Sequence, residues 1–167
     1  MKRMMKLTSV VLTIITLSAA ARESVAETVP YHAIGIGAYS PSNGNYRGSG
    51  VGTPLGRHTF HGIVAVSPTS NPMVFEFAST VDQETVDCNG DTITFSSSGQ
   101  VQLIPLDSTY TTFPAIWTGH FVVTGGTGRF AHVRPAAKPL SVIAINDPFM
   151  LTDPMWNFFG HLTAASS

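Results

Sequence analysis

Hydrophobic and polar residues alternate along residues 73–78. Met73, Phe75 and Phe77 fall on one side of an extended chain, and Glu76 falls on the other side. A period of two is the pattern of a β-strand with one buried face, whereas a helix repeats its apolar positions every three or four residues. The segment therefore predicts a strand whose phenylalanines point inward and whose Glu76 points outward.

Glycine and proline interrupt the chain too often for long helices. All 15 glycines and all 11 prolines come after residue 26, and residues 73–89 are the longest later stretch free of both. The many Val, Ile, Phe and Thr residues also favour a pleated surface. We therefore predict an all-β protein. The expected strands are Tyr31–Tyr39, Gly56–Val66, Met73–Thr80, Thr92–Ser97, Gln100–Ile104, Ala115–Thr124, Leu140–Asn146 and Met155–Ala165.

Turn residues separate these strands at nearly regular intervals, which predicts one antiparallel barrel or sandwich. In the strand expected at 115–124, Gly119 shares a face with Trp117 and Phe121. A small residue among large ones fits a strand that bends or approaches its neighbour closely, as barrel closure requires. The acid-rich segment 82–87 is expected to form a solvated loop or hairpin shoulder.

The first 26 residues have the pattern of a secretory signal peptide. Lys2, Arg3 and Lys6 form a basic start, an uncharged apolar run follows over residues 7–21, and small residues precede a cleavage site after Ala26. The apolar run is shorter than the ~20 residues of a membrane span. We predict a signal peptide at 1–26, a single barrel domain at 27–167, and a secreted or periplasmic location.

The charge of the chain argues against some kinds of binding partner, and its cysteine content argues against an internal disulfide. Residues 27–167 hold five Lys and Arg against nine Asp and Glu, a net charge of −4. Nucleic-acid binding requires clustered basic residues, so no nucleic-acid partner is expected, and no later apolar run is long enough for a membrane helix. Cys88 is the single cysteine, so the fold cannot depend on an internal disulfide.

Two glycine-rich segments resemble a known group of barrels. Residues 50–62 read GVGTPLGRHTFHG, and residues 122–131 read VVTGGTGRFA. In this order they resemble small secreted bacterial members of the allene oxide cyclase and dirigent superfamily. The resemblance implies an eight-stranded antiparallel barrel, which is often trimeric in plant members, and an isomerase or cyclase activity. It carries over no catalytic residue, because the pocket groups of the plant proteins have no matching motif here.

The second segment also has a physical interpretation of its own. Gly125, Gly126 and Gly128 lie within four residues, and glycine permits positive φ and close approach of the backbone. We expect all three in a tight turn at the rim of the barrel. The alternative is a nest of N–H groups that binds an anion.

Candidate catalytic residues are few: Glu76, His61, His120 and Tyr39. A carboxylate, imidazole or phenol next to a cavity can act as a general acid or base. His58 and His61 are three apart, which sends them to opposite faces of a strand. His120 and His161 could share one wall if their strands pair. Because a zinc site needs three or four convergent ligands, no metal site and no cofactor is predicted.

Sixteen aromatic residues, ten of them Phe, form the remaining feature. An eight-stranded barrel is either filled by its side chains or holds one small ligand, and the sequence leaves both alternatives open. The apolar residues expected at such a pocket are Phe75, Phe77, Trp117, Phe121, Trp156 and Phe158.

Three functions follow from this pattern. The first is binding of a small apolar or aromatic molecule. The second is an isomerase or cyclase that folds its substrate by confinement. The third is a structural or interaction module of the cell envelope, which would expose a large apolar patch. A homo-oligomer is a separate expectation, and a trimer is implied by the resemblance alone.

Overall fold

The computed structural model describes residues 27–105, 114–136, 138–146 and 155–164, and of residues 27, 28, 146 and 155–164 it describes the backbone alone. The predicted signal peptide at 1–26 lies outside the described residues. Nine strands and one short 3-10 helix follow one another: β1 Glu27–Tyr39, β2 Asn45–Thr53, β3 Gly56–Pro68, β4 Val74–Asp87, β5 Thr92–Leu103, β6 Ala115–Gly126, η1 Gly128–Phe130, β7 Val133–Arg134, β8 Leu140–Asn146 and β9 Met155–Ala164.

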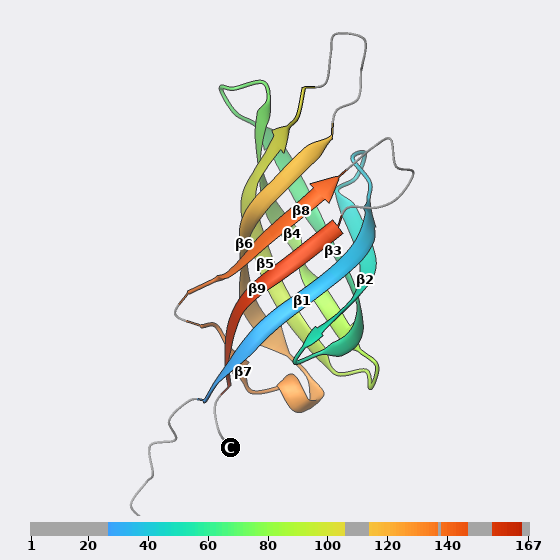
Figure 1. Cartoon of the computed structure of the whole chain (residues 1–167), viewed down its shortest axis with the longest axis vertical. Helices are drawn as coiled ribbons and strands as arrows, with labels where there is room; N and C mark the ends of the chain where they lie inside the picture. The colour runs from blue at the N-terminus through green and yellow to red at the C-terminus, as the bar shows by residue number, and fades with distance from the viewer. Residues whose placement is uncertain (1–26, 106–113, 137, 147–154, 165–167) are drawn as a thin grey trace, which may run out of the picture.

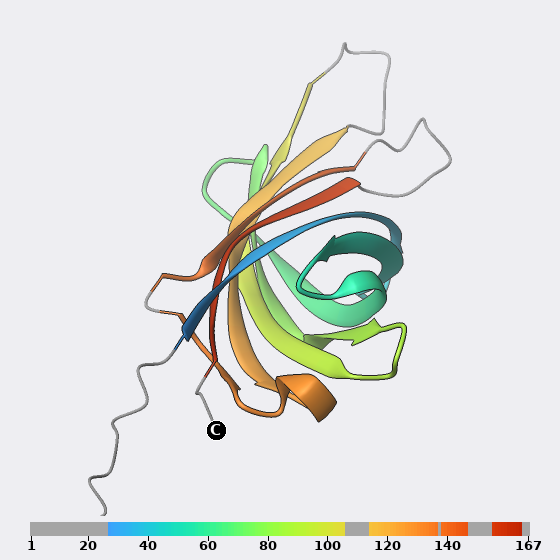
Figure 2. The ribbon, with the colours of Figure 1, turned by 60° about the horizontal axis from the view of Figure 1, so that its bottom comes forward.

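The strands form one antiparallel sheet that closes on itself (Figures 1 and 2). Each strand from β1 to β6 pairs with the next along the chain, β6 continues to β8 and β9, and β9 pairs with β1. The two-residue strand β7 pairs with β9 beside this ring. The prediction of an all-β fold with a single eight-stranded antiparallel barrel is confirmed. In the described residues no helix is long and apolar enough to cross a membrane.

The prediction missed one strand of the barrel and divided another strand into two, so the predicted number of barrel strands is still correct. Residues 45–53 form β2, although the three glycines among them favour a loop by composition. Its glycines from Gly48 to Gly52 alternate with outward side chains such as Ser49 and Val51, and each faces the interior. In the second case, the predicted strands 92–97 and 100–104 are one continuous strand, β5.

The acidic segment after residue 81 was also misinterpreted. It belongs to β4, which continues to Asp87, and Gln83, Thr85 and Asp87 are buried on its inner side. An irregularity between Ala78 and Gln83 interrupts the pairing of β4 with β5 and hides the alternation from a sequence pattern. The predicted orientation of the first half is confirmed, because Phe77 is buried and Glu76 is exposed.

The close approach predicted at Gly119 is present. A Cβ atom built there would lie 2.4 Å from the carbonyl oxygen of Ser98 and 2.8 Å from the ring of Phe77. The glycine therefore lets the Phe77 ring lie directly on the inner face of β6.

The loop prediction for residues 125–128 is correct for one of its three glycines. Gly128 has a φ of +56°, while Gly125 and Gly126 are the last residues of β6 and do not have positive φ. Thr127 and Gly128 then lead into η1 at the lower end of the barrel (Figure 1).

Candidate functional site

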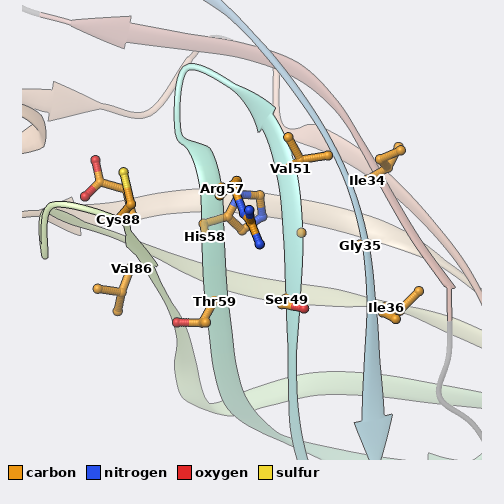
Figure 3. A pocket seen from close by; sticks show the side chains of 12 residues that line it. Ile34, Gly35, Ile36, Ser49, Val51, Arg57, His58, Thr59, Val86 and Cys88 are labelled. Carbon is orange, nitrogen blue, oxygen red and sulfur yellow. The ribbon is translucent and has the colours of Figure 1, made fainter.

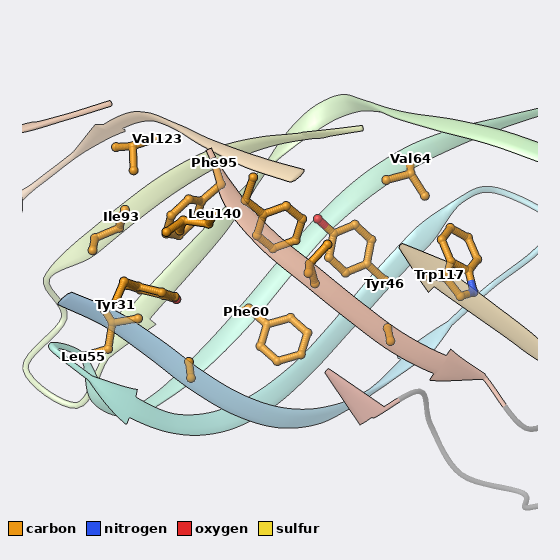
Figure 4. Packing of buried hydrophobic residues seen from close by; sticks show 14 of the residues in the cluster. Tyr31, Tyr46, Leu55, Phe60, Val64, Ile93, Phe95, Trp117, Val123 and Leu140 are labelled. Carbon is orange, nitrogen blue, oxygen red and sulfur yellow. The ribbon is translucent and has the colours of Figure 1, made fainter. Parts of the chain in front are cut away.

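The interior of the barrel is filled by its own side chains (Figure 4). Phe60, Phe95 and Phe121 are each buried, and the ring centres of Phe95 and Phe121 lie 5.8 Å apart. Tyr31 packs edge-on against Phe95 at 5.6 Å, and burial raises the pKa of its phenol. Of the two alternatives left open by the sequence, the described residues show the filled core.

One small enclosed hollow lies toward the end of the barrel that carries Tyr39. Its volume is about 10 Å³, which is room for about one water molecule. Trp117 lies edge-on to Tyr39 at 5.0 Å and tilted against Phe77 at 5.1 Å. The residues around the hollow are Tyr39, Tyr46, Val64, Phe77, Ser97, Trp117 and Phe121.

Several predicted pocket residues therefore meet at this hollow, which we call the aromatic end. Phe77, Trp117 and Phe121 line it together with Tyr39, and Phe75 is half-buried against the same core. The side chains of Trp156 and Phe158 lie outside the described residues.

The predicted catalytic residues do not come together. Glu76, His61 and His120 are exposed on the outer faces of three different strands, β4, β3 and β6. The Nε2 atom of His61 lies 3.5 Å from a carboxylate oxygen of Glu84, and both side chains are solvent-accessible. Because β8 lies between β6 and β9, the hypothesis that the strands of His120 and His161 pair directly is wrong. No group of three potential metal ligands occurs among the described residues.

A large hollow lies on the outside of the barrel, where it crosses β1, β2, β3 and β4 (Figure 3). This outer groove has a volume of about 580 Å³. Its apolar side chains are Ile34, Ile36 and Val51, which are all about half exposed, and Val86, which is less exposed. Gly35 and Gly50 lie between them and add no outward side chain.

Polar groups border the outer groove on its β3 side. Arg57 and Thr59 are exposed there, and Ser49 stands opposite Thr59 on β2. Between Arg57 and Thr59, the side chain of His58 points into the barrel interior. His58 and the exposed His61 therefore lie on opposite faces of β3, as predicted. The Nδ1–H of His58 donates to the carbonyl oxygen of Gly56 at 3.0 Å, and burial lowers the pKa of the imidazole.

Asp87 lies at the β4 border of the groove and is held by several donors. The backbone N–H groups of Asn89 and Asp91 donate to its Oδ1 atom at 2.8 and 3.1 Å, and Arg129 donates to Oδ2 through Nε at 2.9 Å. Burial by itself would raise the pKa of this carboxyl, but the amide of Asn89, Arg129 and the amide of Asp91 outweigh it and lower the pKa. The carboxylate is therefore a fixed anion with its acceptors engaged.

Arg129 extends this arrangement to a third segment. Its Nη2 atom also donates to the carbonyl oxygen of Leu55 at 3.4 Å, and its guanidinium stacks on the ring of Phe130 at 4.5 Å. Arg129 of the glycine-rich segment thus connects η1 by hydrogen bonds to Leu55 in the β2–β3 turn and to Asp87 at the end of β4. The sequence pattern gave no indication of this pairing, because the two partners are 42 residues apart.

Comparison with known proteins yields no relative: no family model, no curated protein sequence and no solved structure matches this chain. Function is therefore inferred from the geometry of the chain alone.

Proposed function

We propose that this protein is a binding module that takes a small apolar or aromatic molecule in the outer groove. The observation that supports this proposal is the coexistence of a filled interior and an outer hollow of about 580 Å³. Ligand sites for small molecules have volumes of ~300–1,000 Å³ and are lined mainly by apolar side chains with a few polar groups. The groove has both features.

The groove has an apolar side on β1 and β2 and a polar side on β3, and this difference would orient a bound molecule. Ile34, Ile36 and Val51 would cover its apolar body, because burying aliphatic surface is favourable and requires no directed contact. Arg57 and Thr59 would face any polar substituent from the β3 side. The free and exposed Cys88 also lines the groove on its β4 side, and binding requires no reaction of its thiol.

The isomerase or cyclase alternative is supported less well by the geometry. Catalysis by confinement needs a hollow that surrounds the substrate, and the enclosed hollow at the aromatic end has a volume of about 10 Å³. The polar candidates for acid–base catalysis on β3, β4 and β6 point away from that hollow.

The proposal is tested by isothermal titration of the purified protein with 1-naphthol, a small neutral aromatic probe. We expect saturable binding, and we expect Val51→Lys to weaken it at least about tenfold because a charge would enter the apolar side of the groove. Val81→Lys is the matched control, since both valines are 51% exposed and Val81 lies outside the groove. Equal binding by the two variants, or no binding by the unmodified protein, would contradict the proposal.

A further inference from the structure

One row of outward side chains crosses the outer groove from β1 to β3. Val51 on β2 is the register partner of both Ile34 on β1 and Arg57 on β3, and all three side chains are exposed (Figure 3). Since adjacent strands are ~4.8 Å apart, the backbones at the two ends of the row are separated by ~10 Å. The row, which we call the Arg57 row, is therefore apolar over two strands and ends on a cation.

The guanidinium of Arg57 is available to a ligand. No residue in the described part of the chain forms a hydrogen bond or an ion pair with this guanidinium. Among the described residues that line the groove, Arg57 is also the only Lys or Arg, and the neighbouring His58 is held in its neutral form by burial. The positive charge of the groove is thus concentrated at one end of the row.

The acid at the groove does not neutralise Arg57. Asp87 lines the groove, but its side chain is 0% exposed and accepts a hydrogen bond from Arg129. Arg129 also lies 3.7 Å from a carboxylate oxygen of Asp91. Neither Asp91 nor Glu84 on β4 is among the residues that line the groove. The charged group that a ligand meets at the surface of the groove is therefore the cation.

Two hydroxyl groups lie on the same side of the groove as this cation. Thr59 is two residues further along β3, ~7 Å from Arg57, and Ser49 is its register partner on β2. Both hydroxyls are exposed and can donate hydrogen bonds. A guanidinium presents paired N–H donors that match the two oxygens of a carboxylate. The polar side of the groove can thus supply several donors to one anionic group.

We propose that the ligand of the outer groove is an apolar acid, with a ring or hydrocarbon body and one carboxylate. The proposal rests on the proposed function, because it names the charge of the molecule that the groove would take. The body would cover Ile34 and Val51, and the carboxylate would lie against Arg57. A cationic ligand would oppose a like charge in this position, and a neutral one would displace water from the guanidinium without supplying an anion.

The experiment is isothermal titration of the purified protein with 2-naphthoate and with 2-naphthamide. The two probes have the same two rings and a planar group of similar shape, and only naphthoate is charged at neutral pH. We expect naphthoate to bind at least about fivefold more tightly, because a hydrogen bond between two charged groups is stronger than one to a neutral amide.

A substitution of Arg57 shows whether this residue causes the preference. In Arg57→Gln, we expect the two probes to bind with similar affinities, and binding of naphthamide should persist because the apolar part of the row is unaltered. Arg47→Gln is the matched control. Arg47 is an exposed arginine on the neighbouring strand β2 that does not line the groove, so this variant should keep the preference for naphthoate.

Equal binding of the two probes by the unmodified protein would overturn the proposal and leave the groove as a site for neutral molecules. A preference that survives Arg57→Gln would also overturn it. The same holds for a preference that Arg47→Gln removes to the same extent, since the total charge of the protein would then be its cause. Absence of binding for both probes and for 1-naphthol would instead contradict the proposed function itself, together with the proposal for an acid.

Discussion

Two buried ionisable side chains at the lower end of the barrel are kept in different charge states, one neutral and one negative. His58 and Asp87 are register partners on β3 and β4. Asp87 remains charged because Arg129 and two backbone N–H groups donate to it, whereas His58 remains neutral because burial disfavours the imidazolium. Two neighbouring positions thus differ in charge, because Asp87 accepts hydrogen bonds that outweigh its burial and burial of His58 favours its neutral form.

The neutral state of His58 predicts a pH dependence of stability. The folded pKa of His58 is lowered from 6.5, so the unfolded chain binds a proton at a higher pH than the folded protein does. The free energy of unfolding should therefore fall as the pH drops below about 6.5, and this contribution should level off once the folded pKa is passed. Replacing His58 with Asn should remove that part of the slope, as measured by urea unfolding at a series of pH values.

His61→Asn is the matched control, because His61 lies on the same strand and is exposed. This variant should keep the slope of the unmodified protein. If His58→Asn keeps it as well, the acid sensitivity has another source and the assignment to His58 is wrong.

At the scale of the elements, the end of β6 shows how a glycine can be required without positive φ. A Cβ atom at Gly126 would lie 2.5 Å from the carbonyl oxygen of Phe130 and 2.8 Å from that of Thr92. At the preceding Gly125, a Cβ atom would meet only the Thr94 hydroxyl, at 3.2 Å. The first position faces rigid backbone, and the second faces a side chain that can rotate.

The two glycines therefore predict different costs for the same substitution. Gly126→Ala should destabilise the fold by ~1–3 kcal/mol, which is the usual range for forced overpacking. Gly125→Ala should change stability by less than about 1 kcal/mol, since the threonine can give way. Chemical unfolding of both variants measures the difference, and equal costs would show that the backbone contacts at Gly126 do not control this connection.

The same elements show what local patterns can and cannot predict. The alternation at residues 73–78 predicted the inward and outward faces of β4 because that part of the strand pairs regularly. The pattern failed beyond Ala78, where the pairing shifts, and at β2, where inward glycines replace the apolar residues that normally mark a strand. A Cβ atom would meet the Phe60 ring at Gly48, the His58 ring at Gly50 and Ala33 at Gly52, and these neighbours belong to other strands.

At the scale of the whole molecule, barrel closure creates features that no segment contains. Ile34 and Ile143 lie 109 positions apart in the sequence, yet both pair in register with Asn157. Arg57, Asp87 and Val51 border one groove for the same reason. The sequence predicted the fold class and three aromatic residues of the core, Phe77, Trp117 and Phe121, whereas the buried rings of Phe60 and Phe95 were not among the predicted residues. The outer groove depends on which strands become neighbours, so it could not be predicted from the sequence pattern.

The central claim is that the barrel is filled and that its ligand binds on the outer wall. The most direct measurement is a map of backbone amide chemical shifts in two-dimensional NMR spectra during a titration with 1-naphthol. We predict saturable shifts that concentrate at residues 34–36, 49–51, 57–59 and 86–88, which line the groove. Shifts that concentrate instead at Tyr39, Phe77 and Trp117 would place the ligand inside the aromatic end and contradict the claim.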